Sequence, residues 1–231
     1  MSEHDEALAG RIHYLIVRGL LDAGAAPTTA EMAHALSLSE AEIEAGLQTL
    51  SDIHGLVLHP NRCEPWIAHP FACSPSATWV QGPKHGWWAP CLWCAFGVAT
   101  LAGGEVTVHS RIGGEAEAVQ IPVRDGQPQR DDLLVHFAIR PRNAWDNVHH
   151  HCNMVLPFRS EAEIDAWSAR HRLPRGKGVP LAQVADLARV WYGRHADREW
   201  RKWNGDQAQA IFHGAGLTDD FWTLTTGGGK F

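Results

Sequence analysis

Helical and extended patterns occupy separate parts of this 231-residue chain, and this separation constrains its fold more than any other sequence feature. Near the N-terminus, Leu8, Ile12, Leu15, Ile16 and Leu20 recur at the spacing of one helix face. Thr28-Thr-Ala-Glu31 and Ser39-Glu-Ala-Glu42 both match the capping box, which predicts two further short helices. Residues 53–58 follow as a strand with a turn after it. Three helices and a β-wing predict a winged-helix-like unit over residues 1–70.

The remaining residues, 71–231, predict a sheet domain with flanking helices and a helical C-terminal extension. Residues 105–109 and 117–123 alternate on either side of Gly113-Gly114 and predict a hairpin. Further strands are expected at 133–139 and 152–158, and helices at 89–101, 160–171, 181–191 and 206–213. Residues 71–88 have no clear periodicity and predict an irregular connection. The fold class is therefore α+β, with a winged-helix-like unit packed on a mixed, mostly antiparallel sheet.

Charge and hydropathy exclude two kinds of partner. The net charge is −6, and the presumed recognition helix carries Glu40, Glu42 and Glu44 but no Lys or Arg, so nucleic acid is not expected to bind. No apolar run reaches the length that spans a membrane, and the first residues are acidic where a signal peptide is basic. We therefore expect a cytoplasmic protein without nucleic-acid or membrane partners.

The five cysteines carry the chemistry that the sequence suggests. In a reducing compartment they are expected to be thiols or ligands, because disulfides are rare there. Cys91 and Cys94 lie in Trp88-Ala-Pro-Cys-Leu-Trp-Cys94, and Cys152 follows three histidines. Thiolates are nucleophiles and soft ligands, so cysteines that converge in one pocket select soft metals. We expect Cys94 and Cys152 to meet in space, with Cys91 as a third candidate metal ligand.

The segments around Cys94 and Cys152 resemble the organomercurial (alkylmercury) lyase family. The resemblance covers about residues 28–171 and includes Trp93-Cys94-Ala95 and the Trp167 of Asp165-Ala-Trp-Ser-Ala-Arg-His171. It implies that Cys94 and Cys152 grip the mercury of R–Hg and labilise its carbon–metal bond. It also implies a small organometal substrate, low-molecular-weight thiols as partners, Hg(II) as product, no required cofactor, and a role in detoxification. Residues 190–222 resemble the end of longer, actinobacterial-type members.

The sequence departs from this family at the proton donor. The family places an aspartate three residues after the first cysteine, where this chain has Gly97. The donor that replaces it is left open among Asp146, Cys91 and the histidines at 149–151, with Asp146 as the predicted catalytic residue. Because a carboxylate at that position would face the site, we also expect Gly97→Asp to raise turnover.

Other readings of the cysteines stay open. A non-catalytic or repurposed family member would bind Hg(II) or copper through Cys94, Cys152 and either Cys91 or a histidine. A structural zinc would need more ligands than one CxxC, and a thioredoxin-type pair would need a βαβ setting that the chain lacks. Cys63 and Cys73 have no partner at useful spacing and are expected to be packing residues.

Overall fold

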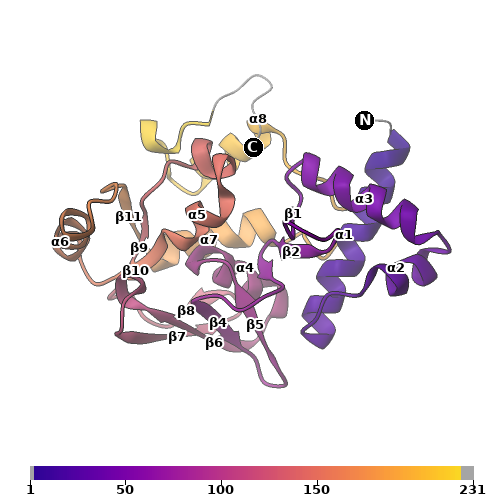
Figure 1. Ribbon diagram of the computed structural model, residues 1–231. Helices are drawn as coiled ribbons and strands as arrows, with labels where there is room; N and C mark the ends of the chain where they lie inside the picture. The colour runs from indigo at the N-terminus through magenta and orange to yellow at the C-terminus, as the bar shows by residue number, and fades with distance from the viewer. Residues whose placement is uncertain (1–2, 225–231) are drawn as a thin grey trace.

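The structure is a computed structural model that describes residues 3–224, and its fold is α+β as predicted (Figure 1). The α-helices are α1 (Glu3–Ala23), α2 (Thr29–Leu36), α3 (Glu40–Asp52), α4 (Leu92–Ala102), α5 (Val148–Asn153), α6 (Glu161–His171), α7 (Leu181–Tyr192) and α8 (Gly205–Gly214). Three 3₁₀ turns are η1 (Ile112–Gly114), η2 (Pro141–Asp146) and η3 (Asp220–Trp222). The strands are β1 (Val57–Leu58), β2 (Pro65–Ala68), β3 (Phe71–Ala72), β4 (Thr78–Gln81), β5 (Gly86–Ala89), β6 (Glu105–Arg111), β7 (Ala118–Arg124), β8 (Gln127–Pro128), β9 (Leu134–Phe137), β10 (Val155–Phe158) and β11 (Lys177–Pro180).

The N-terminal helices form where the sequence signals place them. Ile12 and Ile16 of α1 are fully buried, and both predicted capping boxes are present at the starts of α2 and α3. The strand predicted over residues 53–58 is shorter, because Ile53 caps α3 and only Val57 and Leu58 pair with β2. The description of this unit as a winged helix stays a prediction.

Most strands belong to one eight-stranded sheet with the order β1-β2-β3-β5-β4-β6-β7-β8, and every pairing in it is antiparallel. The prediction of an irregular connection over residues 71–88 is wrong, because strands β3, β4 and β5 form there. These strands have only two to four residues each, too few for an alternating pattern to be visible. The sheet also continues across residue 70 through the β2–β3 pairing, while the division into two domains there stays a prediction.

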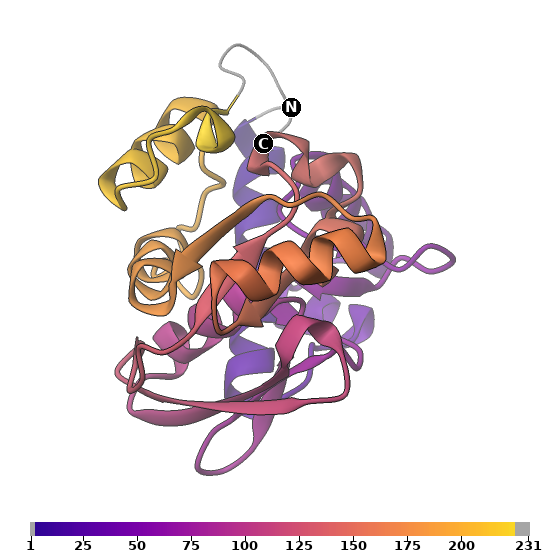
Figure 2. The ribbon, with the colours of Figure 1, turned by 90° about the vertical axis from the view of Figure 1, so that its left-hand side faces the viewer.

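A second, three-stranded sheet has the order β10-β9-β11 and is antiparallel as well. The strand predicted from residue 152 begins only at Val155, because the residues before it form α5. In Figures 1 and 2, α6 lies beside this smaller sheet, at the opposite end of the molecule from α1.

Helix α4 is the centre of the core. All eight residues from Leu92 to Ala99 are buried, so the helix is apolar on every side, as in an interior helix. It packs against α7, which buries Ala185 and Ala188 along with larger residues. The first turn of α4, which carries Cys94, is therefore held rigidly inside the molecule. None of the helices between residues 3 and 224 combines the length and apolar character that a membrane crossing requires.

Candidate active site

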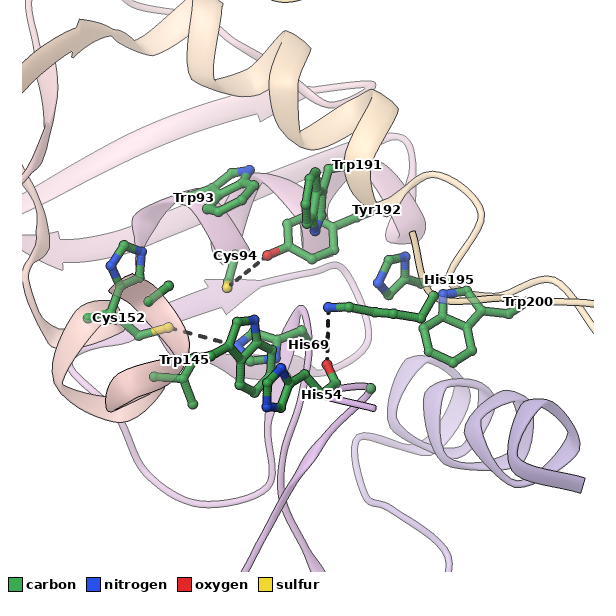
Figure 3. Close-up of a pocket in the computed structure, with 15 residues that line it drawn as sticks. His54, His69, Trp93, Cys94, Trp145, Cys152, Trp191, Tyr192, His195 and Trp200 are labelled. Atoms are coloured by element: carbon green, nitrogen blue, oxygen red, sulfur yellow. Dashed lines mark hydrogen bonds between the residues drawn. The ribbon is translucent and has the colours of Figure 1, made fainter. Parts of the chain in front are cut away.

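Three side chains from distant parts of the chain form a compact group, here called the thiol–histidine cluster: His69, Cys94 and Cys152. One ligand atom from each lies within 4.8 Å of the others. His69 comes from the turn between β2 and β3, Cys94 from the first turn of α4, and Cys152 from α5 (Figure 3). The Cys152 Sγ is 3.8 Å from His69 Nε2. Two thiols and an imidazole are a ligand set suited to soft and borderline metals.

Cys91 is the N-cap residue of α4 and lies within hydrogen-bonding distance of the two cluster cysteines. Its sulfur accepts a hydrogen bond of 3.3 Å from the Cys94 amide. Burial favours the neutral thiol, but hydrogen bonds from the side chains of Cys152 and Cys94 and from the Cys94 amide outweigh it, so the pKa of Cys91 is well below its ordinary value. A helix N-terminus favours a thiolate for the same reason. Cys91 is not one of the three close ligand atoms, so its predicted role as a metal ligand stays a prediction.

The two cluster thiols behave in the opposite way. Burial, together with the neighbouring Cys91, raises the pKa of Cys94 well above its ordinary value. Hydrogen bonds with Cys91 and Cys94, followed by burial, do the same to the pKa of Cys152. These pKa directions favour ionisation of Cys91 over that of Cys94 and Cys152.

The cluster opens into a small cavity with an aromatic wall. The cavity volume is about 50 Å³, room for only a few water-sized groups. Its lining includes five aromatic side chains: Trp93, Trp145, Trp191, Tyr192 and Trp200. Lys202 lines it too; its Nζ donates to the His54 carbonyl at 3.1 Å, and burial lowers its pKa to about 8. The wall favours an apolar organic group of small size.

Only one of the three consecutive histidines reaches this cavity. These residues lie on the short helix α5, so they do not alternate as a strand would, and His151 faces inward while His149 and His150 are exposed. Burial lowers the pKa of His151 and that of His69 to about 4 each. Both imidazoles are neutral at pH 7 and available as acceptors or ligands.

Asp146, the predicted proton donor, lies at the surface. It ends η2, is exposed, and accepts a hydrogen bond of 3.1 Å from Asn143 Nδ2. It is not among the residues that line the cavity. The catalytic role assigned to Asp146 stays a prediction without a contact to the cluster.

The space beside Gly97, where a side chain at this position would lie, is occupied by the ring of Tyr192. Tyr192, the last residue of α7, places its ring against Gly97, and its hydroxyl oxygen lies 3.3 Å from Cys94 Sγ. Burial, and then the nearby Cys94 and Cys91, raise the pKa of Tyr192 well above its ordinary value. Neither Tyr192 nor His69 was selected from the sequence. A lone tyrosine or histidine at the end of an element has no spacing that distinguishes it from a packing residue.

The α+β fold places two buried thiols and a half-buried histidine beside a small aromatic cavity, a donor set suited to a soft metal. The sequence model of the alkylmercury lyase family, MerB, matches residues 71–193, more than half of the chain. The chain belongs to this family. A solved structure described as the mercury-bound form of MerB2 has the same fold, with a TM-score of 0.66 at 14% identity, over 84% of this chain and 92% of that one. No curated protein matches the chain.

Proposed function

We propose that this enzyme cleaves the carbon–mercury bond of a small organomercurial by protonolysis, with Cys94 and Cys152 as the sulfur ligands of mercury. The observation that supports this is the thiol–histidine cluster, whose ligand atoms lie within 4.8 Å of one another beside an aromatic cavity. Mercury(II) prefers thiolates, and the two sulfurs are close enough to share one ion.

The reaction balances with the groups present. A thiolate of the site displaces the ligand X of R–Hg–X and takes the R–Hg⁺ group. A second thiol then adds its sulfur to mercury and gives up its proton, which ends on carbon. The carbon–mercury bond breaks with its electron pair forming the new C–H bond, and R–H leaves. Hg(II) stays on two sulfurs until low-molecular-weight thiols exchange for them.

The setting of the reaction is also part of the proposal. Mercury is substrate and product, so no resident cofactor is required. Low-molecular-weight thiols that remove Hg(II) are abundant in reducing compartments, which favours a cytoplasmic role in detoxification. Asp146 is a candidate donor from the sequence, but a buried group at the cavity is better placed for proton transfer to carbon.

The proposal is tested with methylmercury and excess thiol, with methane as the measured product. We expect wild-type turnover, and loss of both methane and Hg(II) binding in Cys94→Ser and Cys152→Ser, because a hydroxyl is a poor ligand for mercury. Cys63→Ser is the matched control: its Sγ contacts the Glu44 carbonyl at 3.6 Å, away from the cavity. Equal loss in all three variants would indicate unspecific thiol–mercury chemistry.

The small cavity predicts a preference between substrates. The cavity has room for only a few water-sized groups, so methylmercury is expected to enter it more readily than the larger phenylmercury. We expect kcat/KM for methylmercury to exceed that for phenylmercury, once each is divided by the rate of uncatalysed protonolysis. A higher corrected value for phenylmercury would contradict a rigid cavity of this size.

A second candidate function is binding of a soft metal without turnover. His69 supports it, because a third ligand atom beside two sulfurs would hold a metal longer than a site that must release it. Stoichiometric Hg(II) binding with no methane from the wild type would favour this candidate. Copper stays a prediction.

A further inference from the structure

Gly97 leaves a space beside Cys94, and the ring of Tyr192 occupies it. A Cβ atom built on Gly97 would lie 2.3 Å from Tyr192 Cδ2 and 2.8 Å from the Cβ of Pro70. Real carbon atoms do not approach so closely, so no larger residue can stand at position 97 while Tyr192 keeps this position. The two residues are sterically coupled although 95 positions separate them in the sequence.

The phenol of Tyr192 is fixed in one orientation. The side chain is 2% exposed, and its ring packs edge-on to His195 at 5.1 Å and tilted against Trp93 at 5.6 Å between centroids. Its hydroxyl lies 3.3 Å from Cys94 Sγ, and both residues line the cavity (Figure 3). A hydroxyl held this way is positioned to exchange protons with the thiol and with a group bound in the cavity.

Acidic side chains are absent from this position. Within residues 5–224, no Asp or Glu lines the cavity. Lys202 lines it and carries protons, but its Nζ is directed to the His54 carbonyl. The Tyr192 hydroxyl lies within hydrogen-bonding distance of the Cys94 sulfur, at 3.3 Å.

We propose that Tyr192 is a catalytic residue of this enzyme, which relays the proton of the Cys94 thiol to the carbon of the organomercurial. This inference rests on the proposed lyase function. In the step, the Tyr192 O–H bond breaks as the C–H bond forms, and the carbon–mercury bond breaks. The Cys94 S–H proton passes to the tyrosine oxygen, and the Cys94 sulfur binds mercury.

The relay explains how a tyrosine can act in an apolar site. A buried tyrosinate without compensation is costly. In the relay, the tyrosine is neutral before and after the step, because it receives one proton as it gives another. Cys94 becomes a thiolate when it loses its proton, and its negative charge is neutralised when its sulfur binds the mercury that the carbon has left.

Single-turnover release of methane from Tyr192→Phe tests the proposal. This variant keeps the ring that fills the space at Gly97 and removes only the hydroxyl. We expect methane release to slow by about 10²–10⁴-fold, the usual contribution of a positioned acid, with Hg(II) affinity within a few-fold of wild type. The matched control is Tyr14→Phe, because Tyr14 is the only other tyrosine of the chain and lies on α1 under Arg198.

The outcomes separate the two proposals. Methane release by Tyr192→Phe at the wild-type rate would overturn the relay and leave the lyase function standing. No methane from the wild type would overturn the lyase function, and the relay with it.

A second variant tests position instead of chemistry. Gly97→Ala pushes the phenol away from Cys94 and keeps its hydroxyl, so methane release should fall as in Tyr192→Phe. Two protons move in the wild-type step, so the rate in mixtures of light and heavy water should fall along a curve. In Tyr192→Phe the same plot should be straight. A straight plot for the wild type would contradict the relay.

Discussion

At the scale of the residue, Gly97 and Tyr192 show how one side chain can take over the space of another. From sequence alone, Gly97→Asp is expected to raise turnover, because it adds a carboxylate beside Cys94. The structure corrects this expectation: the new Cβ would lie 2.3 Å from Tyr192 Cδ2. The Tyr192 ring of α7 can occupy its position only because residue 97 has no side chain.

We predict that Gly97→Asp alone lowers both stability and turnover. Overpacking of a filled core typically costs about 1–3 kcal/mol, and a buried carboxylate adds to that. In Gly97→Asp/Tyr192→Ala, the ring is gone and the carboxylate has room, so the double variant should release methane faster than Tyr192→Ala. Stability is measured by the urea midpoint and turnover by the methane rate, for the wild type, Gly97→Asp, Tyr192→Ala and the double variant. Faster turnover in the single variant would show that the ring can move.

The site residues differ in how far the sequence can identify them. Cys94 and Cys152 stand out because cysteine is scarce and its chemistry is distinctive. His69 and Tyr192 are common residue types in packing, and only the turn between β2 and β3 and the end of α7 bring them to the sulfurs. Asp146 was selected by its distance along the chain from Cys152, which does not measure its distance in space.

At the scale of the element, short helices set the orientation of the cysteines. Helix α5 has six residues, too few for helical periodicity to be recognised, so the sequence indicated a strand through Cys152. Its start is set by Asn147, whose side chain accepts from the His150 amide at 3.0 Å. Long helices with capping boxes, such as α2 and α3, were predictable for the opposite reason.

The N-cap of α4 gives a prediction at this scale. Cys91→Ala removes the sulfur that accepts from the Cys94 amide, so unfolding free energy should fall by about 0.5–2 kcal/mol. Cys91→Ser should retain stability, because serine is a favoured N-cap residue. Both variants should capture methylmercury more slowly at neutral pH, since both lose the thiol whose pKa is lowered. Equal stability of the alanine and serine variants in urea would contradict the capping role.

At the scale of the whole molecule, the N-terminal helices and the C-terminal extension meet over the cavity. Trp200 lines the cavity and stacks on His13 of α1, with ring centroids 3.6 Å apart. The sheet pairing across residue 70 adds a second connection. Such long-range contacts could not be derived from periodicity, which reports only local structure. The sequence did predict most helices, the β6–β7 hairpin and the α+β class.

The buried histidines make stability depend on pH. Burial lowers the pKa of His13 to about 3, so between pH 6.5 and 3 the unfolded chain binds a proton that the folded chain does not. Stability therefore falls as pH decreases from 6.5, by about 2 kcal/mol per such histidine at pH 5. His13→Phe should reduce the fall in unfolding free energy between pH 7 and 5. His34→Phe, at an exposed position on α2, is the control and should leave it unchanged.

The assembly of the cavity from residues 54 to 202 has a consequence for the newly made chain. Synthesis proceeds from the N-terminus, so Cys91 and Cys94 leave the ribosome well before Trp191 of α7 and Trp200 of the extension, which line the same cavity as Cys94. Until that last part arrives, those thiols are open to any mercury present. A chain that is still being made therefore exposes the thiols that the folded protein buries.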